Sequence, residues 1–132
     1  MIYLESFVLP LDREEDMIDQ RIDSNGGYID NTYPCRIFAQ KRFSDIFFKD
    51  ITIFYGGNGS GKSTLLNLIA TKLELNRIAP FNRSELFDCY VQSCSYTMGY
   101  DDEGFLHRVP NGSRIITSDD IFDYMLTVRY YF

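Results

Sequence analysis

The first fifty residues alternate between short apolar runs and polar turns, a pattern that predicts strands. Residues Ile2–Leu9 are rich in apolar side chains and stop at Pro10, so we expect a strand there. Two further short strands are expected over Arg36–Gln40 and Phe43–Phe48. Between the first strand and these two, Asp12–Ser24 is acidic with apolar residues at helical spacing, which predicts either a short surface helix or a loop.

The strongest pattern in the chain is an uncharged run, a glycine-rich loop and an amphipathic stretch, in that order. Ile51–Tyr55 consists of β-branched and aromatic residues, which predicts a strand buried on both faces, as in a parallel sheet. After the loop we expect a helix from about Gly61 to Leu75, with Asn76 as its left-handed cap. The apolar face of this helix is formed by Leu65, Leu68, Ile69 and Leu73.

The pattern is weaker in the last third of the chain. Leu86–Thr97 is expected to form one or two strands, Tyr100–Gly104 a charged turn, and Ser113–Thr117 another strand. Ser118 is expected to cap a final helix, because acidic residues follow it in the first turn. The aromatic run at Arg129–Phe132 predicts that the native sequence continues or that this end packs on a partner.

Composition narrows the class of protein. The 132 residues suit one domain or one lobe of a larger domain, and a hydrophobic content of 45% is enough for a core, which excludes wholesale disorder. No apolar run approaches the roughly 20 residues of a membrane span, and the start lacks the pattern of a signal peptide. The net charge of −6 disfavours nonspecific binding of nucleic acid, which requires a basic surface.

The cysteines and the single histidine exclude two kinds of site. Cys35, Cys89 and Cys94 are odd in number for a disulfide framework, and their spacing does not match a zinc site. We therefore expect free thiols and a reducing, cytoplasmic location. Because His107 is the only histidine, a histidine-rich metal site is excluded.

One motif in the chain is specific for a function. The sequence G-G-N-G-S-G-K-S-T matches G-x-x-x-x-G-K-[ST] at every specified position, and chance would produce this match in under about 1% of chains of this length. A predicted strand precedes the motif and a predicted helix follows it, which is the context that the motif requires. The candidate nucleotide-binding residues are Gly56, Gly57, Asn58, Gly59, Ser60, Gly61, Lys62, Ser63 and Thr64.

The residue types of the motif fit the binding of ATP with Mg²⁺. Glycines let the backbone approach a polyphosphate, and successive N–H groups then form an anion-binding nest at the start of the helix. Lys62, which we also predict to be catalytic, is expected to reach the β- and γ-phosphates. The Ser63 hydroxyl is expected to bind Mg²⁺, and Thr64 to meet the α-phosphate.

The loop together with the preceding I-T-I-F-Y resembles the ATP-binding domains of the ABC class. The likeness is greatest to the SMC/RecF-like, AAA-labelled bacterial ATPases, and Ser113–Met125 also resembles part of that group. The resemblance implies an α/β P-loop NTPase fold of which this chain is a truncated N-terminal lobe. Its parts would be an antiparallel β layer over 1–50, the strand, P-loop and helix over 51–76, and a mixed β/α region over 77–132. It also implies a homodimer or a second ATPase subunit as partner.

Such ATPases also need a Walker B strand and an LSGGQ-like signature segment. Ile115–Asp120 is the nearest match to a Walker B strand, but it has two apolar residues instead of four and Asp where Glu belongs. Helix capping explains its acidic residues more simply. Ser24–Gly27 resembles the signature segment but lies upstream of the loop, where a tight turn is the simpler interpretation. The chain alone is therefore expected to hold ATP but to hydrolyse it poorly.

Weaker candidates each have a plainer alternative. Gln92 is a candidate second Mg²⁺ ligand by resemblance to the family, but an ordinary polar residue on a strand is the simpler interpretation. Tyr33 lies 23 residues before Gly56 and is a candidate for stacking on adenine. The simpler alternative is that its ring packs against other residues of the protein. Arg42 and Lys49 are candidates for contacting phosphate, and the simpler alternative is that both are solvated surface charges.

Two other functions compete with an ABC-type ATPase. Asp101–Gly104 spells the D-x-x-G of a GTPase, but no N-K-x-D follows it to read guanine, so a GTPase or small nucleotide kinase is the second hypothesis. The third is a regulatory module that binds nucleotide without hydrolysing it. A preference for guanine over adenine would favour the second hypothesis. Binding of nucleotide without hydrolysis, even in a longer chain, would favour the third.

Overall fold

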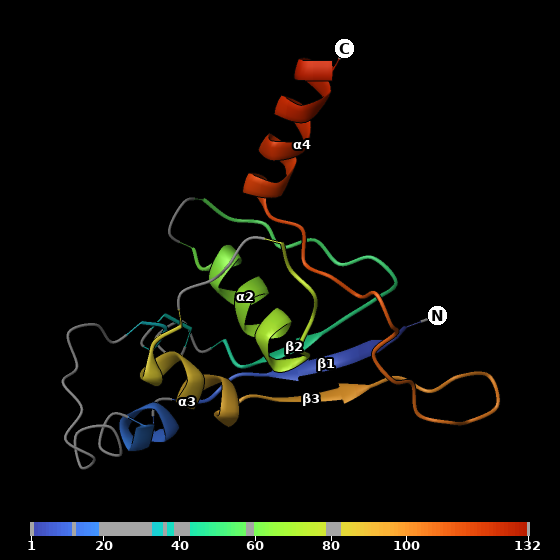
Figure 1. Ribbon diagram of the computed structural model, residues 1–132. Helices are drawn as coiled ribbons and strands as arrows, with labels where there is room; N and C mark the ends of the chain where they lie inside the picture. Colours follow the sequence, from blue (N-terminus) through green and yellow to red (C-terminus); the bar gives the residue numbers. More distant parts are fainter. Residues whose placement is uncertain are drawn as a thin grey trace.

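A computed structural model describes residues 2–11, 13–18, 33–35, 37–38, 43–57, 60–78 and 83–131. The chain is a mixed α/β structure with one three-stranded antiparallel sheet, which Figure 1 shows beneath α2 (Lys62–Lys72). The strands are β1 (Leu4–Val8), β2 (Asp45–Phe47) and β3 (Ser95–Met98), in the order β2-β1-β3. The expected strands over 2–9 and 43–48 are thus confirmed. They pair in an antiparallel sheet, whose third strand comes from 95–98 and not from the first fifty residues.

The central strand β1 sets the register of the sheet. Phe7 lies opposite Ile46 on β2 and opposite Tyr96 on β3. Phe7 is fully buried, whereas the next residue, Val8, is exposed, as expected for a sheet with one face on the core. Residues 37–38 form a bend, so the described part of the strand expected over 36–40 is not a strand.

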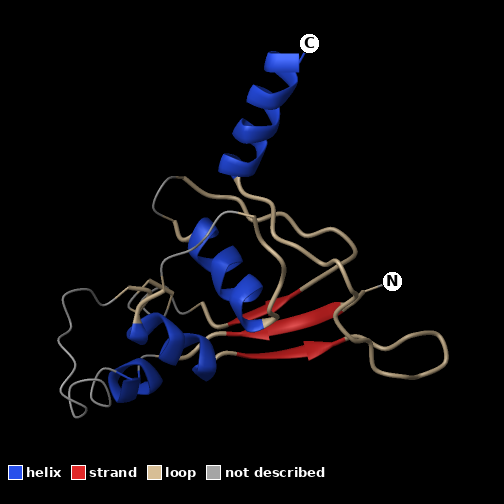
Figure 2. Cartoon of the chain, in the orientation of Figure 1, coloured by secondary structure: helices blue, strands red, loops and turns tan. Residues whose placement is uncertain are grey.

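One helix lies over the sheet, and two others lie beside the end of its strands (Figure 1 and Figure 2). Residues 13–18 are helical, α2 spans Lys62–Lys72 and α3 spans Glu85–Ser93 (Figure 2). The core cluster joins side chains of the sheet and of both named helices. Its fully or nearly fully buried members include Phe7, Leu9, Leu65, Leu68, Phe87 and Tyr90. The expected helix after the glycine-rich loop is therefore confirmed, although it ends at Lys72 and not at Leu75. Leu65, Leu68 and Ile69 of its expected face are buried, and Leu73 is half-buried just after the helix.

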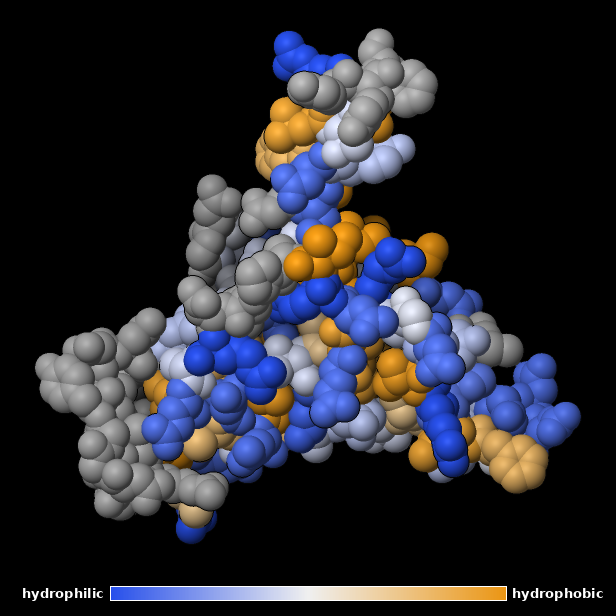
Figure 3. All heavy atoms as spheres, viewed as in Figure 1, coloured by the Kyte–Doolittle hydropathy of each residue, from blue (hydrophilic) through white to orange (hydrophobic). Residues whose placement is uncertain are grey.

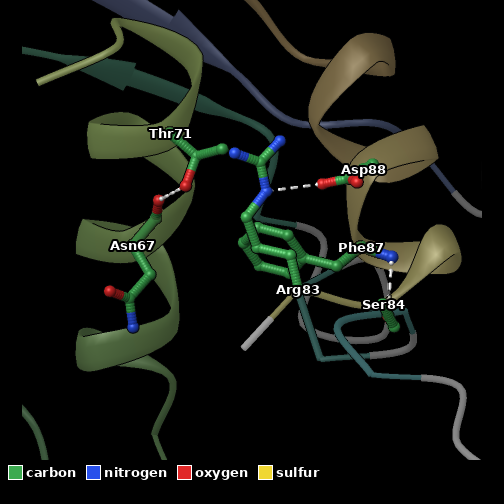
Figure 4. A network of polar contacts seen from close by, with 6 residues as sticks. All are labelled: Asn67, Thr71, Arg83, Ser84, Phe87 and Asp88. Carbon is green, nitrogen blue, oxygen red and sulfur yellow. Dashed lines mark hydrogen bonds and ion pairs between the residues drawn. The ribbon is translucent and has the colours of Figure 1, made fainter. Parts of the chain in front are cut away.

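The prediction of strands over 86–97 is wrong for its first part, which is α3. Ser84 caps this helix by accepting a hydrogen bond from the Phe87 N–H at 3.0 Å, and Figure 4 shows this contact beside the Arg83–Asp88 ion pair. The apolar residues then repeat with helical spacing, and the buried ones are Leu86, Phe87, Tyr90 and Val91. A cap followed by that spacing outweighs the strand propensity of Tyr and Val.

The prediction of a buried strand over Ile51–Tyr55 is also wrong. The segment is irregular, and the side chains of Ile51, Ile53 and Tyr55 are 83%, 82% and 100% exposed. Only Phe54 turns inward, where its ring meets that of Phe48 at a centroid distance of 6.3 Å. The physical reason is that a strand is stable only beside a hydrogen-bonding neighbour, and no described strand lies next to this segment.

The segment before the last helix differs from the expected strand. Within Ser113–Thr117 only Arg114 makes a bridge, a parallel one with Asn76. Asn76 is therefore paired and is not the left-handed cap of α2; the left-handed residue there is Glu74, with φ of 55°. The described turn at Asp102–Gly104 agrees with the expected charged turn.

The last helix, α4 (Ser118–Tyr131), is confirmed, although its cap is not Ser118. The Thr117 hydroxyl accepts from the Asp120 N–H at 3.4 Å, and the Asp120 carboxylate accepts from the Thr117 N–H at 2.9 Å. These reciprocal bonds make Thr117 the cap. The helix extends away from the sheet in Figure 1, and Figure 3 shows apolar residues on its surface. Its exposed apolar side chains include Ile121, Phe122, Tyr124, Met125 and Leu126.

We expect a substitution in the core to lower the free energy of unfolding much more than one in the irregular segment at 51–55. Leu68→Ala should lower the free energy of unfolding by about 2–5 kcal/mol, because Leu68 is fully buried. Ile53→Ala should change it by less than about 0.5 kcal/mol, because Ile53 is 82% exposed. Urea unfolding followed by circular dichroism measures both. Equal losses for the two variants would show that Ile53 is buried in a sheet after all.

Candidate functional site

The glycine-rich loop leads directly into the N-terminus of α2. Gly61 precedes the helix with φ of 98°, a left-handed conformation that residues with a Cβ rarely adopt. A Cβ at this position would also lie 2.9 Å from Cε1 of Phe38 and 3.1 Å from Cγ2 of Ile37. Glycine is therefore required here by both the backbone conformation and the packing. Asn58 and Gly59 lie outside the described residues.

The loop closes on itself through its lysine. The Lys62 ammonium donates a hydrogen bond to the carbonyl oxygen of Gly56. This bond links the end of the motif to its first residue. The Ser60 N–H donates to the Gly57 carbonyl at 3.2 Å, and a Cβ at Gly56 would lie 2.6 Å from the Ser60 hydroxyl oxygen. The positive charge of Lys62 is thus held over the loop backbone.

The first turn of α2 offers hydrogen-bond donors. The Leu65 N–H donates to the Gly61 carbonyl at 2.9 Å, so the helical ladder begins there. The N–H groups of Lys62, Ser63 and Thr64 have no acceptor inside a helix that starts at this point. In the described part of the chain no side chain caps this terminus, and no acidic residue lies in its first turn. This end of the helix therefore favours an anion.

The two hydroxyls of the motif lie in different surroundings. Ser63 is exposed. Thr64 is buried, and its hydroxyl accepts a hydrogen bond from the Tyr33 hydroxyl at 2.9 Å. Tyr33 in turn lies parallel to the Phe87 ring, at 9° and a centroid distance of 6.1 Å.

A cavity of about 360 Å³ adjoins the lysine. It is lined by residues of the loop and the first turn of α2, together with four aromatic residues and one isoleucine of the preceding segments: Phe38, Phe43, Ile53, Phe54, Tyr55, Ser60, Gly61, Lys62 and Leu65. The volume falls in the range of small-molecule sites, and the lining combines aromatic surface with one cation. A larger cavity of about 600 Å³ lies elsewhere, between residues 13–18 and α3.

Gln92 is not brought to the loop. It is exposed on α3, not on a strand, and it lines the larger cavity, which shares no lining residue with the cavity beside Lys62. Lys49 is exposed near the start of the irregular segment, and Arg42 lies outside the described residues.

Sequence reasoning missed Phe38 as the neighbour of Gly61 and Tyr33 as the donor to Thr64. No local pattern could reveal either contact, because each joins residues more than 20 positions apart.

Two competing motifs have structural explanations. Asp120 of the Walker B-like segment accepts from the Thr117 N–H as part of the helix cap. Asp101 of the D-x-x-G segment accepts from the N–H groups of Glu103 and Phe105, both at 2.9 Å, and so stabilises its own turn. Ser24–Gly27, the segment similar to the signature, lies outside the described residues.

All three cysteines are described, and all are free thiols, as expected. Cys94 is buried, and its thiol donates to the Tyr90 carbonyl at 3.4 Å. Burial raises the pKa of Cys94 to about 12, so the thiol stays protonated at neutral pH and is not an activated nucleophile.

No group of three or more His, Cys, Asp or Glu side chains is placed to hold a metal ion in the ranges that the structure describes. None of the helices within those ranges has the length and apolar character that crossing a membrane requires. Comparison of the chain with protein-family models, curated proteins and solved structures found no match.

Two glycine variants should differ in stability. Gly61→Ala should cost about 1–3 kcal/mol, because alanine is strained at φ of 98° and would press on Phe38. Gly57→Ala is the matched control and should cost less than about 0.5 kcal/mol, since its Cβ would meet nothing within 4 Å. Thermal unfolding of both variants tests this, and a stable Gly61→Ala protein would contradict the left-handed start of α2.

Proposed function

We propose that this chain binds ATP with Mg²⁺ through residues 56–64, as the nucleotide-binding part of an ATPase similar to the ABC and SMC/RecF-like class. The observation that supports the proposal is that α2 begins directly after Gly61, within a segment that matches the P-loop motif at every specified position. Three N–H groups and the Lys62 ammonium lie at the start of this helix. A set of donors without a carboxylate in the first turn fits a polyphosphate.

Each residue of the motif has a role in this proposal. Lys62 exchanges the Gly56 carbonyl for oxygens of the β- and γ-phosphates, which are stronger acceptors because they are charged. Ser63, being exposed, supplies one ligand to Mg²⁺, and phosphate oxygens and water supply the others. Thr64 contributes its N–H near the α-phosphate, while its hydroxyl is engaged by Tyr33.

Hydrolysis is proposed to need a second polypeptide segment. Phosphoryl transfer depends on a residue that orients the attacking water. Asp120, from the segment nearest to a Walker B strand, is instead part of a helix cap. We therefore propose that segments outside these 132 residues supply the Walker B and signature functions, in an assembly with a second copy of the protein or a second ATPase subunit. A cytoplasmic location agrees with the three free thiols.

Calorimetric titration with Mg-ATP and Mg-GTP tests the proposal. We expect saturable binding of Mg-ATP, weakened about 10- to 100-fold by Lys62→Ala, because a charge-assisted hydrogen bond contributes about 1.5–3 kcal/mol. The matched control is Lys72→Ala, which removes the same charge from the other end of α2 and should leave the affinity unchanged.

Two results would contradict the proposal. Equal affinity in Lys62→Ala and the unaltered chain would place any nucleotide away from the loop. A clear preference for Mg-GTP would instead favour a GTPase, the second hypothesis from the sequence.

A further inference from the structure

Tyr33 connects the candidate site to α3. Its hydroxyl donates to the Thr64 hydroxyl at 2.9 Å, in the first turn of α2. Its ring lies parallel to that of Phe87, which is 1% exposed and belongs to α3. Tyr33 belongs to neither helix, and the two residues that follow it, Pro34 and Cys35, are buried. The tyrosine is thus anchored on the core side and directs its hydroxyl at the motif.

The position of Phe87 is itself fixed by the cap of α3. The Phe87 N–H donates to the Ser84 hydroxyl at 3.0 Å, and Figure 4 shows Ser84 and Phe87 at the start of that helix. A series of contacts therefore runs from Ser84 through Phe87 and Tyr33 to Thr64. It ties the N-terminal turns of α3 and α2 together at the point where α2 presents its N–H groups.

This geometry differs from that of a residue that stacks on adenine. The Tyr33 ring is beside Phe87, and its hydroxyl is committed to Thr64. We propose that Tyr33 is a positioning residue for the nucleotide site: it holds the first turn of α2 so that its N–H groups face the phosphates. This inference rests on the proposed function, since it concerns the affinity of the same loop.

The proposal assigns Tyr33 to the phosphate end of the ligand. A group that orients N–H donors should affect every ligand that carries the phosphates, whether or not a nucleoside is attached. A group that stacks on the base should affect ATP but not inorganic tripolyphosphate. The two ligands therefore separate positioning from stacking.

Tyr33→Phe is the principal test, because it removes the hydroxyl and keeps the ring. We expect it to weaken binding of Mg-ATP and of Mg-tripolyphosphate by the same factor, about 3- to 10-fold, the range for loss of one uncharged hydrogen bond. Tyr96→Phe is the matched control, since Tyr96 lies on β3 in the sheet and should leave both affinities unchanged.

A double-mutant cycle with Thr64 distinguishes positioning from general loss of structure. In a Thr64→Val background, Tyr33→Phe should cause no further loss of affinity, because its partner is already absent. Thr64→Ser keeps the hydroxyl and should retain coupling to Tyr33. All titrations are made well below the unfolding temperature of each variant, which circular dichroism measures, so that every sample is fully folded.

The outcomes separate the two proposals. Unchanged affinities in Tyr33→Phe, a loss for Mg-ATP alone, or a further loss in the Thr64→Val background would each overturn the positioning role while leaving the loop as the nucleotide site. If the unaltered chain binds neither ligand, the proposed function fails and the positioning role fails with it.

Discussion

The left-handed backbone at Gly61 determines where α2 begins, and the candidate site depends on that point. With φ of 98° and Phe38 packed where a Cβ would lie, only glycine suits the position. From there the helix turns Leu65 and Leu68 into the core. The same start leaves three N–H groups and the Lys62 ammonium at the N-terminus of the helix. One residue thus links the packing of the core to the display of hydrogen-bond donors.

Residues from an earlier segment complete this arrangement. Phe38 packs on Gly61, and Tyr33 donates to Thr64, although both precede β2 in the chain. The candidate site is therefore held from its core side by the region before β2 and by α3, and not by a strand at 51–55.

The parts of the structure that follow from local sequence could be predicted, and the parts that depend on distant neighbours could not. The loop and α2 depend on adjacent glycines and on an apolar spacing within eleven residues, so the sequence indicates both. Ile51–Tyr55 has high strand propensity, but a strand forms only beside another strand. For α3 the signal was present: Ser84 before a helical apolar spacing indicates a capped helix, and strand-forming Tyr and Val obscured it.

The central claim is that the N–H groups at the start of α2 bind the triphosphate of ATP. Nuclear magnetic resonance of the ¹⁵N-labelled chain during titration with Mg-ATP tests it most directly. The account predicts saturable downfield shifts of the amide protons of Lys62, Ser63 and Thr64, with Gly104 and Gly112 unmoved. Saturable shifts confined to residues of the larger cavity, such as Cys89 and Gln92, would contradict it, as would no shift at all.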